Sequence, residues 1–148
     1  MLGSMVASFK MTIFYHKITN DLPHNLSGYD MGCVHVVFLI PEHTLPIVFI
    51  DGTEVPKHPI VYVEWYTPLP DHPEPNHLLY KVSPQKDRDG TYICSIIPLA
   101  NIHHSIHLYP RFGAFTPQDW SSSNVLDRCN TFFVNHFTDR LTMYRIAC

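Results

Sequence analysis

Proline divides this chain into short apolar runs. The 148 residues include 13 prolines but only six glycines. Because proline fixes φ and removes a backbone hydrogen-bond donor, long uninterrupted helices are not expected. The runs between the prolines are rich in Val, Ile, Phe and Tyr, which favour pleated, half-buried strands. The pattern therefore predicts a mainly β chain.

The strand-length runs and the turn signals set the expected architecture. Two Asp-Gly pairs, at 51–52 and 89–90, predict hairpin turns because both residues tolerate positive φ. We predict a single small domain, a partly open β-barrel or a sandwich of about seven to nine strands. The runs of strand length are 9–18, 33–40, 46–50, 60–66, 77–82, 91–97, 104–109, 131–137 and 140–146.

One stretch carries helical signals instead. In 116–129, Thr116 can cap a helix, Pro117 suits the first helical position and Asp119 can reach back to the cap. A second short turn can begin at Ser122 or Ser123. We therefore expect one short helical insert near 116–129.

The start of the chain and its cysteines suggest a compartment. The opening MLGSM contains Gly-Ser-Met, typical of a cloning remnant, so residues 1–4 are set aside and 5–148 are taken as one β-rich domain. There is no positively charged, apolar signal segment, and no apolar run is long enough to cross a membrane. The four cysteines form no C-x-x-C pair, and we expect reduced thiols, with Cys33 and Cys94 in the core. An intracellular protein, nuclear or cytoplasmic, is the expectation.

Charge limits the kinds of partner. The formal net charge is −3, and the ten lysines and arginines are scattered. Tight binding to nucleic acid usually requires a basic stripe, which is not visible here. Folding can still gather distant arginines, so nucleic acid remains a possible partner beside protein or peptide.

Three histidines fall within 101–113, NIHHSIHLYPRFG. His103 and His107 have the i, i+4 spacing that can bind zinc on a helix. The Ile and Tyr neighbours and the flanking prolines favour a strand instead, on which these two histidines share a face with Ser105. We prefer structural histidines and no cofactor. The alternative is a zinc site of His103 and His107, completed from another strand by His35, His136 or a cysteine.

Glu64 is an acidic residue inside an apolar strand, VYVEWY. We expect it to face away from Tyr62 and Tyr66, or to pair with an arginine such as Arg140 or Arg145. Catalysis is the weaker interpretation, because the chain has no G-x-S-x-G elbow and no Gly-rich phosphate loop.

An aromatic strand end precedes a proline-rich loop. Trp65 and Tyr66 lead into 67–75, TPLPDHPEP, and together they predict a shallow amphipathic surface for a peptide or a stacked base. Trp65 fits the core better than a contact surface, whereas Tyr66 and the loop are better placed for contact. The residues predicted to bind a partner are Trp65, Tyr66, His72, His77, Arg111 and Arg140.

Four stretches, 33–41, 61–82, 95–113 and 119–140, cover most of 33–146. The last, DWSSSNVLDRCNTFFVNHFTDR, is the most specific. In their order they resemble the C-terminal region of Plavaka or KDZ-type transposases, and their associated proteins, of mushroom-forming fungi. That family usually carries basic residues where this chain has His103 and His104, and tends to have proline at His136. The exchange argues against a metal role for the histidines and puts phosphate contact there in doubt.

The resemblance implies a module appended to a transposase, whose acidic catalytic residues lie in a separate upstream domain. We therefore expect a non-catalytic binding or assembly module that contacts protein, peptide or nucleic acid and no membrane. One alternative is a small metal-dependent hydrolase or nuclease that uses its histidines. Another is a structural fragment that packs against its parent transposase.

Overall fold

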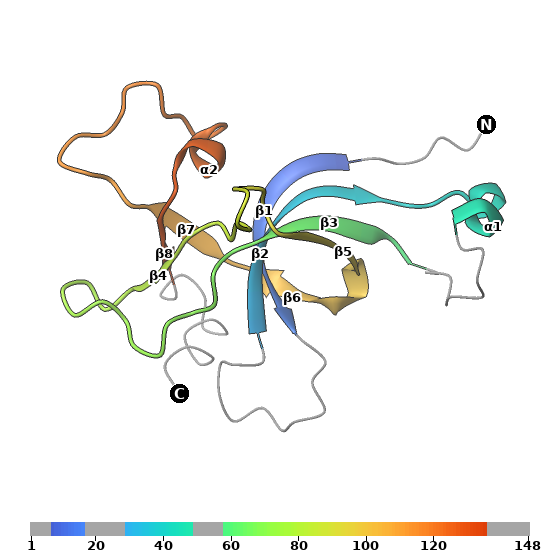
Figure 1. Ribbon diagram of the computed structural model, residues 1–148, viewed down its shortest axis with the longest axis horizontal. Coiled ribbons are helices and arrows are strands. Elements are labelled where there is room, and N and C mark those ends of the chain that lie inside the picture. Colours follow the sequence, from blue (N-terminus) through green and yellow to red (C-terminus); the bar gives the residue numbers. More distant parts are fainter. Residues whose placement is uncertain (1–6, 17–28, 49–57, 136–148) are drawn as a thin grey trace.

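The computed structural model describes residues 7–16, 29–48 and 58–135, and within them the chain is mainly β. Five strands form an antiparallel sheet in the order β5-β3-β2-β1-β6 (Figure 1). The strands of this sheet are β1 (Ala7–His16), β2 (Tyr29–Phe38), β3 (Ile60–Trp65), β5 (Cys94–Pro98) and β6 (Ile102–Ser105).

A second, three-stranded antiparallel sheet lies beside the first, in the order β4-β8-β7 (Figure 1). Its strands are β4 (Tyr80–Val82), β7 (His107–Pro110) and β8 (Phe132–Asn135). Only Ile106 separates β6 from β7, and its side chain is buried between the sheets. The predicted strand 104–109 is therefore one run of chain that passes from one sheet to the other.

The two sheets are joined a second time at the end of β3. Tyr66 forms an isolated bridge with Pro84, and the Gln85 amide donates to the Trp65 carbonyl at 2.7 Å. Within the described residues the sheets do not close into a complete barrel. The prediction of a mainly β, partly open fold with one short helical insert is confirmed.

Among the described residues, the buried side chains form two clusters. One fills the space between the sheets and is built around Phe132, which is fully buried. The other cluster lies on one face of the five-stranded sheet, around Val61 and Val63, which are both fully buried. Gly32 lets the strands approach there, because a Cβ on it would overlap Cγ1 of Val63 and lie 3.2 Å from the Glu64 carbonyl oxygen.

The Asp89-Gly90 turn is present, with a loop one residue longer than the two-residue turn expected. The Asp87 amide donates to the Thr91 carbonyl at 2.9 Å, and Gly90 has φ of +83°. The Asp87 carboxylate accepts the amides of Asp89 and Thr91, each at 2.9 Å. A three-residue loop with glycine in the left-handed region is a common hairpin connection. The other Asp-Gly pair lies outside the described residues.

The helical predictions are partly wrong in position. The run 46–50 does not begin as a strand, since helix α1 (Leu45–Val48) follows a short 3₁₀ turn, η2 (Glu42–Thr44). In the predicted insert only α2 (Val125–Arg128) is helical. Asp119 does not cap a helix at Thr116, because its carboxylate pairs with Arg128. The backbone carbonyl of Asp119 accepts a hydrogen bond from the side-chain amide of Asn124. The predicted strand 140–146 lies outside the described residues.

Candidate functional site

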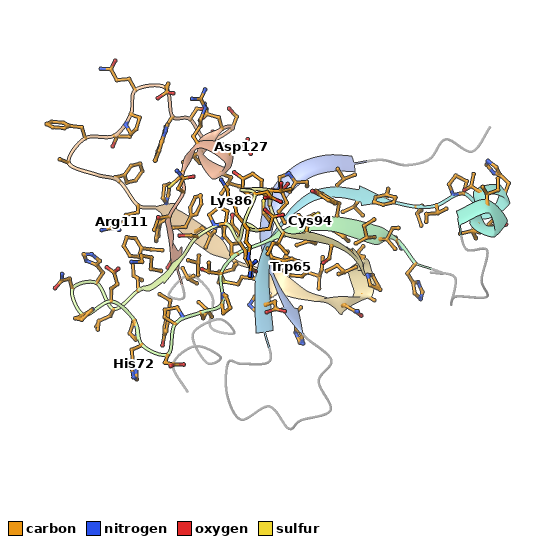
Figure 2. All side chains as sticks on the ribbon, viewed as in Figure 1. Trp65, His72, Lys86, Cys94, Arg111 and Asp127 are labelled. Carbon is orange, nitrogen blue, oxygen red and sulfur yellow. The ribbon has the colours of Figure 1, made fainter. Side chains whose placement is uncertain are left out.

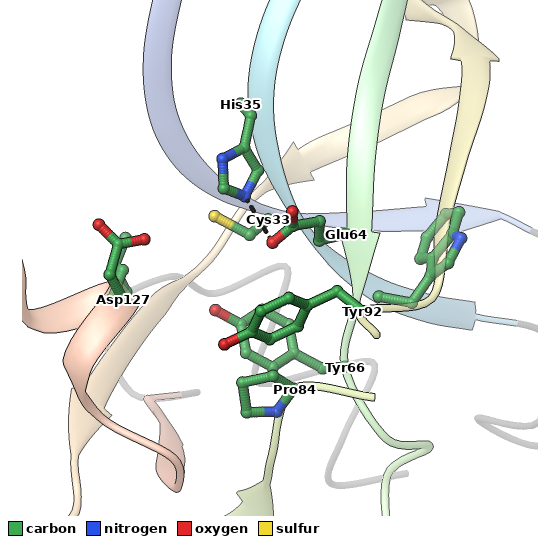
Figure 3. A pocket seen from close by; sticks show the side chains of 9 residues that line it. Cys33, His35, Glu64, Tyr66, Pro84, Tyr92 and Asp127 are labelled. Atoms are coloured by element: carbon green, nitrogen blue, oxygen red, sulfur yellow. Dashed lines mark ion pairs between the residues drawn. The ribbon is translucent and has the colours of Figure 1, made fainter. Parts of the chain in front are cut away.

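A bulge in β2 creates the site. The register between β2 and β3 pairs Cys33 with Glu64 and Val34 with Val63, but then pairs Val36 with Tyr62. His35 is therefore the extra residue on the β2 side. A bulge bends its strand and redirects a side chain, and such bulges are frequent next to functional sites. Here the bulge directs the His35 ring toward β3 (Figure 3).

His35 and Glu64 form a half-buried pair. The His35 Nε2 lies 3.0 Å from the Glu64 Oε2, with 21% and 24% of the two side chains exposed. The Tyr62 hydroxyl donates to the other carboxylate oxygen of Glu64 at 3.3 Å, and the Tyr62 and His35 rings meet edge to face at 5.9 Å. Both oxygens of this carboxylate are thus held by neighbouring side chains.

The position of Glu64 corrects two expectations. Alternate residues of a strand share a face, so Tyr62 and Glu64 lie on the same side of β3, as their hydrogen bond requires. The described partners of Glu64 are a histidine and a tyrosine, not an arginine. Arg140 and Arg145 lie outside the described residues.

The phenol of Tyr62 has a perturbed pKa. The adjacent Cys94 thiol, burial and the negative charge of Glu64 together raise the pKa of Tyr62 from 10.0 to about 12. Each of these influences disfavours the phenolate. Tyr62 therefore stays protonated and keeps donating to Glu64 throughout the physiological pH range.

A cavity of about 300 Å³ lies beside this pair (Figure 3). One wall carries the carboxylate of Glu64, and the exposed Asp127 of α2 lies on another side. Tyr66 and Tyr92 supply aromatic rings below Glu64. No lysine or arginine of the described ranges lines this space. The lining residues are Cys33, His35, Glu64, Trp65, Tyr66, Pro84, Tyr92, Leu126 and Asp127.

Trp65 and Tyr66 both line the cavity but in different ways. The Trp65 side chain packs against the Val61 and Val63 cluster, and its Nε1 donates to Ser95 Oγ at 2.9 Å. Tyr66 is only 5% exposed and meets Phe132 edge to face at 5.8 Å. Tyr66 thus contributes to the wall of the cavity and not to an open surface.

The other predicted binding residues within the described ranges, His72, His77 and Arg111, do not line this cavity. Figure 2 shows His72 in the loop after β3 and Arg111 near the three-stranded sheet, both away from Trp65. His77 is exposed and packs edge to face on Phe133 at 5.4 Å. Arg140 lies outside the described residues. The loop 67–75 is mostly exposed, with bends at Asp71 and His72 and a turn that begins at Pro75.

The histidine run is a pair of strands, as preferred. His103 and His104 lie on β6 with their rings 6.4 Å apart, and His107 lies beyond the Ile106 crossing on β7. Within the described part of the chain, no three His, Cys, Asp or Glu side chains come together in a way that could hold a metal ion. The zinc alternative stays a prediction, since His136 and Cys148 are not described.

Sequence reasoning missed His35, Tyr92 and Asp127 as members of one site. Glu64 gave a signal, as an acidic residue in an apolar strand. The other three come from three further segments, and no glycine or proline at the β2 bulge indicates it in the sequence.

The prediction that Cys33 and Cys94 lie in the core is half right. Cys33 is buried, but Cys94, which is opposite Glu64 on β5, is exposed.

Comparison with known proteins adds no family to this geometry. No family model, no curated protein and no solved structure matches the chain. The resemblance to fungal transposases therefore stays a prediction. No helix of the described residues is long and apolar enough to cross a membrane.

Proposed function

We propose that this chain is a non-catalytic binding module whose cavity accepts a positively charged side chain of a protein or peptide partner. The observation that carries the proposal is the carboxylate of Glu64 set beside aromatic walls in a cavity. Aromatic faces attract cations, and a nearby carboxylate adds Coulombic attraction that is stronger in a partly desolvated space.

The charges around the cavity favour a peptide over nucleic acid. Glu64 and Asp127 both line it, and a phosphate group would meet them with like charge. The net charge of −3 acts in the same direction at longer range. If the transposase resemblance holds, the module would serve an intracellular transposon-encoded protein by docking basic segments of a partner or of its parent chain.

The test uses blocked amino acids, so that no partner sequence is needed. Nα-acetyl-lysine methylamide, the arginine equivalent and the uncharged norleucine equivalent are titrated into the labelled full chain, and amide and side-chain shifts are followed by NMR. The two cations are expected to shift signals of the cavity-lining residues, and norleucine is not. In Glu64→Gln the cation affinity should fall about tenfold, which equals about 1.4 kcal/mol.

Asp71→Asn is the matched control, because Asp71 is an exposed carboxylate of the loop outside the cavity. It should leave the cation affinity unchanged. Equal affinity for norleucine and lysine, or an undiminished affinity in Glu64→Gln, would overturn the proposal. So would binding to single- or double-stranded DNA that weakens steeply with salt and competes with the blocked lysine.

A further inference from the structure

We infer that the cavity selects a methylated ammonium, such as a trimethyl-lysine side chain, over unmodified lysine or arginine. This inference rests on the proposed function and names its ligand class. It follows from the hydrogen-bonding state of the lining groups, from the rings and from the space.

The Glu64 carboxylate already has two partners within the protein. The two oxygens of Glu64 accept from Tyr62 at 3.3 Å and lie against His35 Nε2 at 3.0 Å. Their charge is present, but their hydrogen-bonding capacity is partly occupied. Pro84 and Leu126, whose side chains accept no hydrogen bonds, line the cavity, and the exposed Asp127 carboxylate is the other acidic group of its lining.

This arrangement penalises ligands with many N–H groups. Lysine brings three donors and arginine five, and each donor moved from water to an apolar wall loses a hydrogen bond. A quaternary ammonium has no N–H group to satisfy, yet it keeps its positive charge. The attraction to Glu64 and to the ring faces is thus retained without that loss.

Two tyrosine rings line the cavity together with Glu64. Tyr66 is fixed by burial and by its edge-to-face contact with Phe132. Tyr92 already takes a cation of this chain, since Lys86 Nζ lies 4.5 Å from its ring centroid. Lys86 is not among the residues that line the cavity. This contact shows that one face of the Tyr92 ring is accessible to a cation.

The space also suits a bulky head group. A volume of about 300 Å³ is about ten times the share of one water molecule in the liquid. A bare ammonium would leave much of it to water, whereas three methyl groups would bring carbon into contact with the rings, Pro84 and Leu126. Burial of that apolar surface favours the methylated form.

The experiment compares four probes with the full chain by NMR titration: blocked lysine, blocked trimethyl-lysine, its uncharged analogue with carbon in place of nitrogen, and choline. Trimethyl-lysine should bind at least about tenfold more tightly than lysine. The uncharged analogue should bind no better than lysine. Choline, a free quaternary ammonium, separates a peptide site from a small-molecule site, and it should bind more weakly than trimethyl-lysine, which adds contacts along its stem.

Variants tie the preference to the cavity. Tyr92→Ala should abolish the preference for trimethyl-lysine, because it removes the ring, and Tyr92→Phe should keep it, because it retains the ring. Tyr92 is 36% exposed, so its truncation should not open the core. Phe115→Ala is the control, because Phe115 is 89% exposed in the loop before Trp120 and lines no part of the cavity. Preservation of the preference in Tyr92→Ala would overturn the inference.

The outcomes separate the two proposals. Equal affinity for lysine and trimethyl-lysine, both lowered in Glu64→Gln, would overturn the methyl preference and leave the cation site standing. Tighter binding of choline than of trimethyl-lysine would overturn the peptide assignment. If none of the charged probes shifts the cavity signals, both proposals fall.

Discussion

The histidine run at 103–107 and the single His35 differ in how clearly the sequence marks them and in what they contact. His103, His104 and His107 are conspicuous in the sequence, yet they lie on two strands of different sheets. His35 stands alone in the apolar run 33–40, yet it pairs with Glu64 at the edge of a cavity. Proximity in sequence did not assemble a site, whereas one extra residue in a strand did.

The bulged region depends on close strand packing at Gly32. In Gly32→Ala the new Cβ would overlap Val63, which is β-branched and fully buried and so has little room to move. We expect the free energy of unfolding to fall by about 1–3 kcal/mol. Urea denaturation of the full chain measures it.

Gly113→Ala is the control for that substitution, because a Cβ at Gly113 has no atom within 4 Å. Its effect should stay within about 0.5 kcal/mol. Equal destabilisation by the two variants would contradict the close packing of Gly32 against Val63.

His35 and His103 should differ in how much each contributes to the free energy of unfolding. His35→Ala removes one of the two described partners of the half-buried Glu64 carboxylate and should cost about 0.5–1.5 kcal/mol of unfolding free energy. His103→Ala changes an exposed side chain and should cost less than about 0.5 kcal/mol. Chemical denaturation at pH 8 compares them, and a larger loss from His103→Ala would reverse the contrast.

The phenol of Tyr62 should ionise at a higher pH than that of an ordinary tyrosine. Its pKa is raised to about 12, so its absorbance change at 295 nm should come well above that of an ordinary tyrosine. The folded state binds this proton more tightly than the unfolded chain does. Tyr62 therefore contributes stability that is fully present below pH 10 and is lost as the pH rises from 10 to about 12.

Two variants check the assignment of that titration. Tyr62→Phe should remove the late phase and the alkaline loss that accompanies it. Glu64→Gln should move the phase to lower pH, because it removes a negative charge that disfavours the phenolate. A late phase that persists in Tyr62→Phe would assign it to another of the eight tyrosines.

The smallest effect is expected in the hairpin that carries Tyr92. Lys86→Gln removes the cation above the Tyr92 ring and should destabilise the protein by about 0.5 kcal/mol, since both groups are exposed. Arg88→Gln removes an exposed cation of the same turn and should have no measurable effect on stability. The difference in thermal midpoint between these two variants measures the contact, and identical midpoints would contradict it.

The β class and most strands followed from the sequence because alternation, β-branched residues and prolines act locally. The Asp89-Gly90 turn was predicted for the same reason, since its glycine adopts positive φ whatever surrounds it. The helix cap at Thr116 failed because Asp119 found longer-range partners in Arg128 and Asn124. Local signals held where no tertiary contact competed with them.

For the site, the sequence determined only that an acidic residue sits in an apolar strand and that aromatic residues follow it. The tertiary structure decided the rest. Register places Cys33, Glu64 and Cys94 in one row across three strands, and the bulge turns His35 onto that row. Tyr92 and Asp127 come from a hairpin and a helix that only folding brings near. Register and bulges arise from packing between distant segments, and no local pattern in the chain encodes them.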